Sequence, residues 1–422
     1  MSAGDWAASS VVEHRLHTAG VGGSKPSLPT IRSPVIRLAA AFVCRVCGGT
    51  ARGISRRAPK GRCFEDQTMP RKIDADTILN DARVTLMGVA GSPYTRKMLA
   101  VLRYRQIPYR LLIASNVAGG ELTGLPVPKP SLLPTFFLPA DDGTLQAVTD
   151  STPLIRRFEA SHPGRSVIPS DPALALIDAL IEDYADEWLT KAMFHYRWHY
   201  QADIDKASAI LATWSRPPLS DEEHARYGKL IADRQIPRLR YVGSNETTAP
   251  VIEASYERFL DAFEHHLRTH RYLLGTRPGS SDFGVFGQLT QLAHFDPTCM
   301  AVTLKRAPRV YGWVGNVEDL SGLLPEENDW FDVQALPATV TAILREIGRV
   351  YPAAMLANAQ AVMNGATEVS TQIDGKPWVQ QPFPYQAKCL QWLRRDHALL
   401  DAAARKRFDT AIAGTGCEAL FN

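Results

Sequence analysis

The chain has 422 residues, of which 45% are hydrophobic and 22% charged, a balance typical of a globular protein that can bury a sizeable core. At roughly 100–200 residues per domain, this length predicts two or three domains. No stretch approaches the ~18 consecutive apolar residues that a membrane span needs, so we expect no membrane insertion.

The formal net charge of +3 is unevenly distributed along the chain. Residues 1–68 hold ten Lys and Arg against four Asp and Glu, which leaves 37 against 40, a net of −3, for residues 69–422. A mildly acidic body does not provide the basic patch that nucleic acid requires, so we expect no nucleic-acid partner. Its three scattered cysteines make no disulfide framework and indicate a reducing, cytoplasmic location.

Residues 1–68 are rich in Gly, Ser, Arg and Pro and show no sustained helical or strand period, which predicts a disordered leader. Cys44 and Cys47 are interpreted as incidental, because no second ligand pair for zinc follows. The stretch around residues 23–26, "GSKP", resembles the translation of a transfer RNA gene, which would make Met69 the true start. The alternative is a transit peptide, since the leader is rich in Arg and poor in acids.

Residues 80–165 carry, in order, the signals of a strand, a helix, a strand, a long loop, two strands and a helix. The expected strands, buried or ending at turns, cover residues 84–89, 109–114, 135–140 and 145–149. The expected helices have apolar residues at helical spacing and cover residues 94–105 and 151–162. A β-α-β unit followed by a hairpin and a helix is the thioredoxin-like arrangement, so we predict an α/β thioredoxin-like domain here.

Three separated motifs of this domain resemble those of glutathione S-transferases. The stretch "GSPYTRK" (91–97) resembles the catalytic loop of the serine-type classes, with Ser92 and Thr95 where a redox motif has cysteines. The stretch "LLPTFF" (132–137) resembles the segment with a cis-proline before the third strand. The stretch "DSTPLIRRFEASHP" (150–163) resembles the acid-serine motif and its helix.

The loop at Ser92 has chemistry that agrees with this resemblance. A strand that ends at a helix N-terminus gathers free N–H groups and positive dipole potential, which favour an anion. A hydroxyl donor at Ser92 would lower the pKa of a thiol below its usual value of about 8.5. The resemblance implies that this thiol belongs to glutathione. The alternative is that Ser92 only caps its helix, and the two roles are compatible.

The resemblance also implies which residues hold glutathione as co-substrate. The backbone of Leu133, before the cis-proline Pro134, would pair with its cysteinyl backbone like an added strand. Asp150 would meet the ammonium and Ser151 the carboxylate of its γ-glutamyl end. An ordinary trans proline at Pro134 and a pure capping role for Ser151 remain the alternatives.

Residues 171–322 are predicted to form the larger all-α domain of the family, so the chain as a whole should be mostly helical. One long helix is expected over 171–200, and its aromatic side suits either an apolar second substrate or packing between domains. This side carries Tyr184, Trp188, His195, Trp198 and His199. No third ligand accompanies the two histidines, so we expect no metal.

The rest of the α domain contains an insertion and a helix cap. Residues 201–250 are interpreted as a turn-rich insertion with a solvated basic stretch. The stretch "YLLGTRPGSSDFGVFGQLTQLAHFDP" resembles the family's central helix with its cap; the cap position falls on Gly279, with Ser280 as the alternative. Residues 323–422 are expected to be a mostly helical extension with a hairpin at Asp374-Gly375, which either covers the pocket or extends the α domain.

These observations predict a glutathione S-transferase-like enzyme that activates the glutathione thiolate for attack on a small, apolar electrophile, with a homodimer left open. The alternative is a non-catalytic binding module with the same fold. A thiol-disulfide reductase is disfavoured, because that reaction needs a protein thiolate and no cysteine lies in the loop 91–97.

Overall fold

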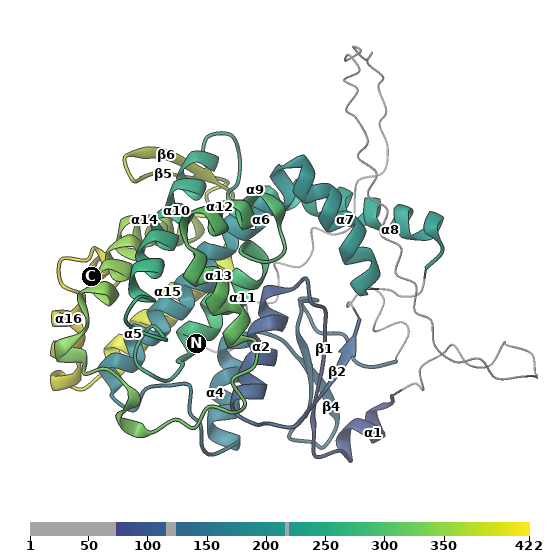
Figure 1. Ribbon diagram of the computed structural model, residues 1–422, viewed down its shortest axis with the longest axis horizontal. Coiled ribbons are helices and arrows are strands. Elements are labelled where there is room, and N and C mark those ends of the chain that lie inside the picture. The colour runs from purple at the N-terminus through teal and green to yellow at the C-terminus, as the bar shows by residue number, and fades with distance from the viewer. Residues whose placement is uncertain (1–72, 115–123, 216–218) are drawn as a thin grey trace, which may run out of the picture. The chain divides into compact units, whose positions relative to one another are not determined.

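The computed structural model describes residues 73–114, 124–215 and 219–422 (Figure 1). The predicted leader, including the cysteine pair and the proposed start, lies outside the described residues, as do residues 115–123 of the long loop. The described residues belong to one unit, Ile73–Asn422, and the account that follows concerns this unit alone.

A four-stranded sheet forms the first part of this unit, as predicted. Its strands are β1 (Val84–Gly88), β2 (Tyr109–Ile113), β3 (Thr135–Pro139) and β4 (Leu145–Val148), in the spatial order β2-β1-β3-β4. The β1–β2 pair is parallel, whereas β1–β3 and β3–β4 are antiparallel. A parallel pair joined by a helix and extended by an antiparallel hairpin is a thioredoxin-like sheet, which confirms the predicted fold class.

The helices of this first part are α1 (Ala75–Leu79), α2 (Pro93–Tyr104) and α4 (Ser151–Ser161). Helix α2 begins where the sequence indicates, because Ser92 caps it and Pro93 occupies its first position, where the missing N–H costs nothing. Its apolar residues are buried against the sheet on one side and against the helical region on the other. The start of α2 is thereby fixed at the end of β1, at the centre of Figure 1.

The predicted long helix is continuous but contains a π-helical turn. It consists of α5 (Pro172–Tyr184), the π-turn η3 (Ala185–Leu189) and α6 (Thr190–His199). Outside the insertion, the remaining helices of the predicted α domain are α10 (Ala249–His266), α11 (Ser280–Leu292), α12 (Pro297–Arg306) and α13 (Pro308–Val317). A π-turn inserts an extra residue into a helix and is frequent at functional sites.

Helix α11 is the fully buried centre of the α region and packs against α2 and α5. Its N-cap is Gly279, as predicted, and the Asp282 carboxylate accepts the backbone N–H groups of Gly279 at 2.9 Å and Leu273 at 3.0 Å. Asp282 thereby forms its own half of a capping box, and the bond that a glycine cannot supply comes from Asp178, whose Oδ1 accepts the Ser281 N–H at 3.0 Å.

The insertion differs from the turn-rich segment that we expected, because it is helical. Its elements are α7 (Gln201–Ser215), α8 (Asp221–Gln235), the 3-10 turn η4 (Ile236–Arg238) and α9 (Leu239–Val242). The polar stretch that suggested turns is instead a helix start: Ser220 and Glu223 form a reciprocal capping box. Helices α7 and α8 lie side by side and form a hairpin, whose small apolar cluster is shared with Trp198 of α6 and with Phe295.

The C-terminal extension is mostly helical, as predicted, and extends the α region. Its elements are η5 (Glu327–Asp329), η6 (Val333–Ala335), α14 (Ala338–Met363), β5 (Val369–Ile373), β6 (Lys376–Gln380), α15 (Pro384–Leu399), α16 (Ala402–Ile412) and η7 (Cys417–Leu420). The hairpin turns at Asp374-Gly375, where both residues have positive φ angles of 54° and 71°, which confirms the turn signal. Helix α14 packs on α10, while α15 and α16 pack on α5.

Candidate functional site

Ser92 lies at the junction of β1 and α2 and is half-buried. Its Oγ accepts the backbone N–H of Thr95 at 3.2 Å, which is the N-cap bond of α2. Its hydroxyl hydrogen points to the carbonyl oxygen of Leu133, 3.4 Å from Oγ. Because capping uses only a lone pair of the oxygen, the hydroxyl remains a donor that can turn to a ligand.

The Leu133–Pro134 segment meets this loop in space. The peptide bond between the two residues is cis, as the sequence resemblance implies. Strand β3 begins at the next residue, and the Thr135 hydroxyl donates to the Leu132 carbonyl at 2.7 Å. The first and second predicted motifs, distant in sequence, therefore form one edge of a common site.

Asp150 and Ser151 begin α4, and both are in contact with other side chains. Asp150 has a φ of 84°, in the left-handed region that few non-glycine residues adopt. Its Oδ2 accepts the Tyr385 hydroxyl of α15 at 2.8 Å. The hydroxyl of Ser151 accepts from the Lys97 ammonium at 3.2 Å. Burial raises the pKa of Asp150 above its usual range, although Tyr385 and Lys97 oppose this shift.

Lys97 is fully buried beneath this end of the site, and the sequence reasoning did not single it out. Its ammonium lies 2.8 Å from Glu182 Oε1 and 2.5 Å from Asp186 Oδ2. Burial opposes the charge of Lys97, yet the two carboxylates hold its pKa above the ordinary value. Arg156 pairs with the other oxygen of Glu182 at 2.8 Å. No local pattern reveals this network, because its partners come from separate helices.

The carbonyl groups of the loop before Ser92 are held by the α region. Arg197 of α6 donates to the Gly91 carbonyl at 2.9 Å and forms a buried ion pair with Asp296 at 2.9 Å. Gln291 of α11 donates to the Ala90 carbonyl at 3.1 Å. The position of Ser92 is therefore fixed from both sides, by its own helix and by the neighbouring domain.

The other polar residues of the loop point away from the site. The Tyr94 hydroxyl donates to the Asp186 carbonyl at 2.8 Å, which ties it to the π-turn. Thr95 is fully buried against Gly88, where a Cβ would lie 2.5 Å from its Cγ2. Thr95 therefore cannot replace Ser92 as a hydroxyl donor to a ligand.

The aromatic side of the long helix is packed into the core, and does not line a pocket. Tyr184 and Trp188 are 0% and 1% exposed, and the Trp188 ring stacks near that of Trp378 with centroids 5.2 Å apart. His195 is buried between Ser244 and Glu253, at 2.8 Å and 3.0 Å. Packing is therefore the correct interpretation for these three residues, whereas His199 at the end of the helix is exposed. Among the described residues no group of three metal-ligating side chains occurs.

An apolar wall next to Ser92 comes instead from the insertion. Helix α7 places Leu211 and Trp214 so close to Gly91 that a Cβ there would lie 2.2 Å from Leu211 Cδ2 and 3.4 Å from Trp214 Cε3. Trp214 is half-buried, and its ring centroid lies 5.0 Å from that of Phe295. The sequence shows an apolar side on 201–215 but not that it packs on this loop.

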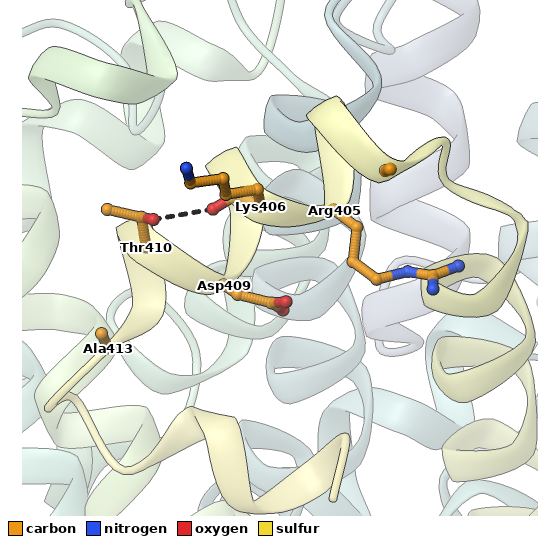
Figure 2. Close-up of a pocket in the computed structure, with 6 residues that line it drawn as sticks. Arg405, Lys406, Asp409, Thr410 and Ala413 are labelled. Carbon is orange, nitrogen blue, oxygen red and sulfur yellow. Dashed lines mark hydrogen bonds between the residues drawn. The ribbon is translucent and has the colours of Figure 1, made fainter.

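A shallow hollow on the surface of α16 is unrelated to this site. Figure 2 shows its wall, which comes from one helix and the residue that follows it and includes Arg405, Asp409 and Thr410. None of the predicted site residues lies there. Arg405 donates to carbonyl oxygens at the end of α15, which is a structural role.

Comparison with protein families agrees with this architecture. The fold combines a thioredoxin-like sheet with an all-α region, and the site has a hydroxyl donor at the N-terminus of α2. This combination is transferase-like. Residues 86–166 match the sequence profile of the glutathione S-transferase N-terminal domain, and residues 230–316 match that of the C-terminal domain. The chain therefore carries both domains of the glutathione S-transferase family, in the order N-terminal then C-terminal. No protein of curated function matches its sequence.

Solved structures of similar chains are distant in sequence. A glutathione S-transferase from Rhodospirillum rubrum is 16% identical, with 56% of this chain and 87% of that chain covered and a TM-score of 0.36. The β-etherase LigF from Sphingobium is 17% identical, with 56% and 94% covered and a TM-score of 0.39. FzlA from C. crescentus is 16% identical, with 54% and 86% covered and a TM-score of 0.35. Among the described residues, no helix is both long and apolar enough to cross a bilayer.

Proposed function

We propose that this protein is a glutathione transferase, in which Ser92 stabilises the glutathione thiolate for attack on an apolar electrophile. The observation that carries the proposal is the Ser92 hydroxyl at the N-terminus of α2, half-buried and aimed at the Leu133 carbonyl. Family membership makes glutathione the expected co-substrate. A thiolate placed here would receive the hydroxyl hydrogen bond and the positive end of the α2 dipole.

The described residues fit the rest of the tripeptide. The backbone of Leu133 lies beside Ser92, where an extended ligand backbone could pair with it. The N-terminus of α4 at Ser151 offers N–H groups for a carboxylate, and Asp150 offers an acceptor for an ammonium. Leu133, Pro134, Asp150 and Ser151 are therefore proposed to orient glutathione, and Ser92 to set its ionisation.

The second substrate is proposed to bind against the apolar wall of Leu211 and Trp214. This wall contacts the loop at Gly91, one residue before the proposed thiolate donor. An electrophile that stacks on Trp214 would lie within reach of the sulfur, and its apolar part would be removed from water. The proposal therefore favours a flat, apolar or aromatic electrophile.

The test compares two capping serines in the full chain. Ser92→Ala removes the cap of α2 and the proposed donor, whereas Ser220→Ala removes only the cap of α8. Each loses about 1 kcal/mol of stability from its cap. A hydrogen bond to an anion contributes about 1.5–3 kcal/mol, so we expect Ser92→Ala to lower kcat/KM for chlorodinitrobenzene at neutral pH by about 10- to 100-fold.

The pH dependence provides a second readout. The reactive thiolate is present above the pKa of the bound thiol and is lost as the pH falls through that pKa. Because Ser92→Ala removes a donor to the thiolate, it should raise this pKa and move the acid side of the kcat/KM profile to higher pH by about one unit. Ser220→Ala should leave activity and the pH profile unchanged. Equal turnover in wild type and Ser92→Ala would remove Ser92 from this role.

A non-catalytic binding module is the second candidate, and one observation favours it. Segments outside the two matched domains remodel the site: Leu211 of α7 packs on Gly91, and Tyr385 of α15 bonds to Asp150. Calorimetric titration with glutathione separates the two candidates. Binding without turnover on a panel of electrophiles would support the module, and binding with turnover supports the enzyme.

A further inference from the structure

The C-terminal extension reaches the candidate site at Tyr385. Tyr385, in the first turn of α15, donates its hydroxyl hydrogen to Asp150 Oδ2 at 2.8 Å, across 235 residues of sequence. The extension lies outside both family-domain matches, which end at residue 316. A part of the chain outside both matched domains therefore contacts a residue that we propose to bind glutathione.

The start of α15 is held rigidly, so this contact is built into the fold. Asn358 of α14 clamps Phe383, the residue before the helix, by donating to its carbonyl at 2.9 Å and accepting its N–H at 2.8 Å. Gln386 donates to the Glu187 carbonyl of the π-turn at 3.2 Å. The Trp392 ring lies edge-on to that of Tyr385, with centroids 6.2 Å apart. Asn358 and Gln386 are 0% and 3% exposed.

We propose that Tyr385 is a positioning residue for the amino end of glutathione: its hydrogen bond to one oxygen of Asp150 fixes the orientation of the carboxylate that accepts the ligand ammonium. This inference rests on the proposed function. A tyrosine hydroxyl is a neutral donor, so it orients the carboxylate without cancelling the negative charge that attracts a cationic group. The bond also fixes the direction of the second carboxylate oxygen. The extension would thereby complete the specificity of the site for a ligand with a free amine.

The charges around Asp150 come from three elements. Lys97 of α2 and Lys388 of α15 attract its carboxylate, whereas Asp186 of the π-turn repels it. Lys97 is already paired with Glu182 and Asp186, so its charge is largely neutralised. The amino group of a ligand would therefore meet a carboxylate in an environment that is not dominated by cations.

The experiment is a cycle of protein and ligand changes in the full chain. Glutathione and glutaryl-cysteinyl-glycine, which lacks only the amino group, are titrated calorimetrically into wild type, Tyr385→Phe and Tyr351→Phe. Tyr351 is the matched control, because its hydroxyl donates to a different carboxylate, Asp183, at 2.5 Å. We expect Tyr385→Phe to weaken glutathione binding by about tenfold and binding of the amine-free analogue by much less.

Binding at several pH values supplies an independent readout. Without its tyrosine donor Asp150 ionises less readily, so the loss of glutathione affinity on acidification should begin at higher pH in Tyr385→Phe than in wild type or Tyr351→Phe. Equal weakening of both ligands, or no weakening, would overturn the inference and leave the proposed function intact. Tighter glutathione binding by Tyr385→Phe would overturn it in favour of a tail that blocks the site. Failure of wild type to bind glutathione would refute the proposed function itself.

Discussion

Replacement of Lys97 by methionine tests whether the buried charge network supports the site. The ammonium of Lys97 is the common partner of Glu182, Asp186 and Ser151, at 2.8 Å, 2.5 Å and 3.2 Å. Methionine has a similar length and no charge, so Lys97→Met removes the cation with little change in volume. The two carboxylates then remain buried with one cation fewer.

The two carboxylates differ in the partners that remain after Lys97 is replaced. Glu182 keeps Arg156 at 2.8 Å and the Ser280 hydroxyl at 2.8 Å, whereas Asp186 keeps only a long contact of 3.5 Å with Thr152. Within the described structure the second oxygen of Asp186 has no hydrogen-bond partner. Removing one partner of a buried ion pair costs about 3–5 kcal/mol, and the retained Arg156 places this case near 3 kcal/mol.

Thermal unfolding measures this cost. At ~2 °C per kcal/mol for a chain of this size, Lys97→Met should lower Tm by about 6 °C. The control is Lys229→Met, which breaks an ion pair with Asp233 at 2.5 Å whose side chains are 74% and 59% exposed. An exposed pair of this kind contributes at most about 0.5 kcal/mol, so Tm should fall by no more than ~1 °C.

The pH dependence of the difference identifies the group responsible. Burial raises the pKa of Asp186 to about 6 in the wild type, where the Lys97 charge opposes the shift. Without that charge the pKa of Asp186 in Lys97→Met is higher still, so its carboxyl is protonated at pH 5. The unpaired charge then disappears, and the loss in Tm should be larger at pH 8 than at pH 5. Equal Tm values for Lys97→Met and Lys229→Met, or a loss that grows on acidification, would refute the reasoning.

Two further predictions concern a buried acid and the apolar wall. Burial raises the pKa of Asp183 to about 7 from 3.8, so wild type loses stability as the pH rises from ~4 to ~7. Asp183→Asn has no ionisable group here and lacks this loss, so its free energy of unfolding should rise by about 2–3 kcal/mol relative to wild type between pH 5 and 8, as measured by urea denaturation. If the difference between the two proteins did not change with pH, the assignment to Asp183 would be wrong. Trp214→Ala should raise KM for an aromatic electrophile about three- to tenfold with little change in kcat. The control Leu230→Ala changes a residue on the same hairpin that is 58% exposed, and it should leave this KM unchanged. Equal effects of the two variants would contradict the proposal that the electrophile binds against Trp214.

Much of the fold could be predicted because its signals are local. The strands and helices of residues 84–161 lie within two residues of their expected ends, since Pro93 and the turn at 141–143 mark them directly. The cap at Gly279 and the hairpin at Asp374 were visible for the same reason. The insertion was misjudged because its polar stretch at Ser220 is a capping box, which has the composition of a turn.

The candidate site was only partly visible in the sequence. Ser92, Leu133 and Asp150 were predicted because each lies in a short motif that resembles one of the glutathione S-transferases. Lys97 and Tyr385 were missed, although both touch the acid-serine pair. Their roles depend on contacts between segments 54 and 235 residues apart, for which a single sequence carries no periodic or compositional signal.

The sequence by itself determined the order of the elements, the fold class and the loop that places a hydroxyl at a helix N-terminus, because backbone propensity and capping act over a few residues. Only the tertiary structure decided what surrounds that loop. It decided between the two interpretations of the aromatic side at Trp188, which is packed into the core. It also brought Trp214 of the insertion to Gly91, and placed Tyr385 of the extension on Asp150. These contacts form when helices bury their apolar faces against one another, and the energy of that burial depends on the whole packed arrangement.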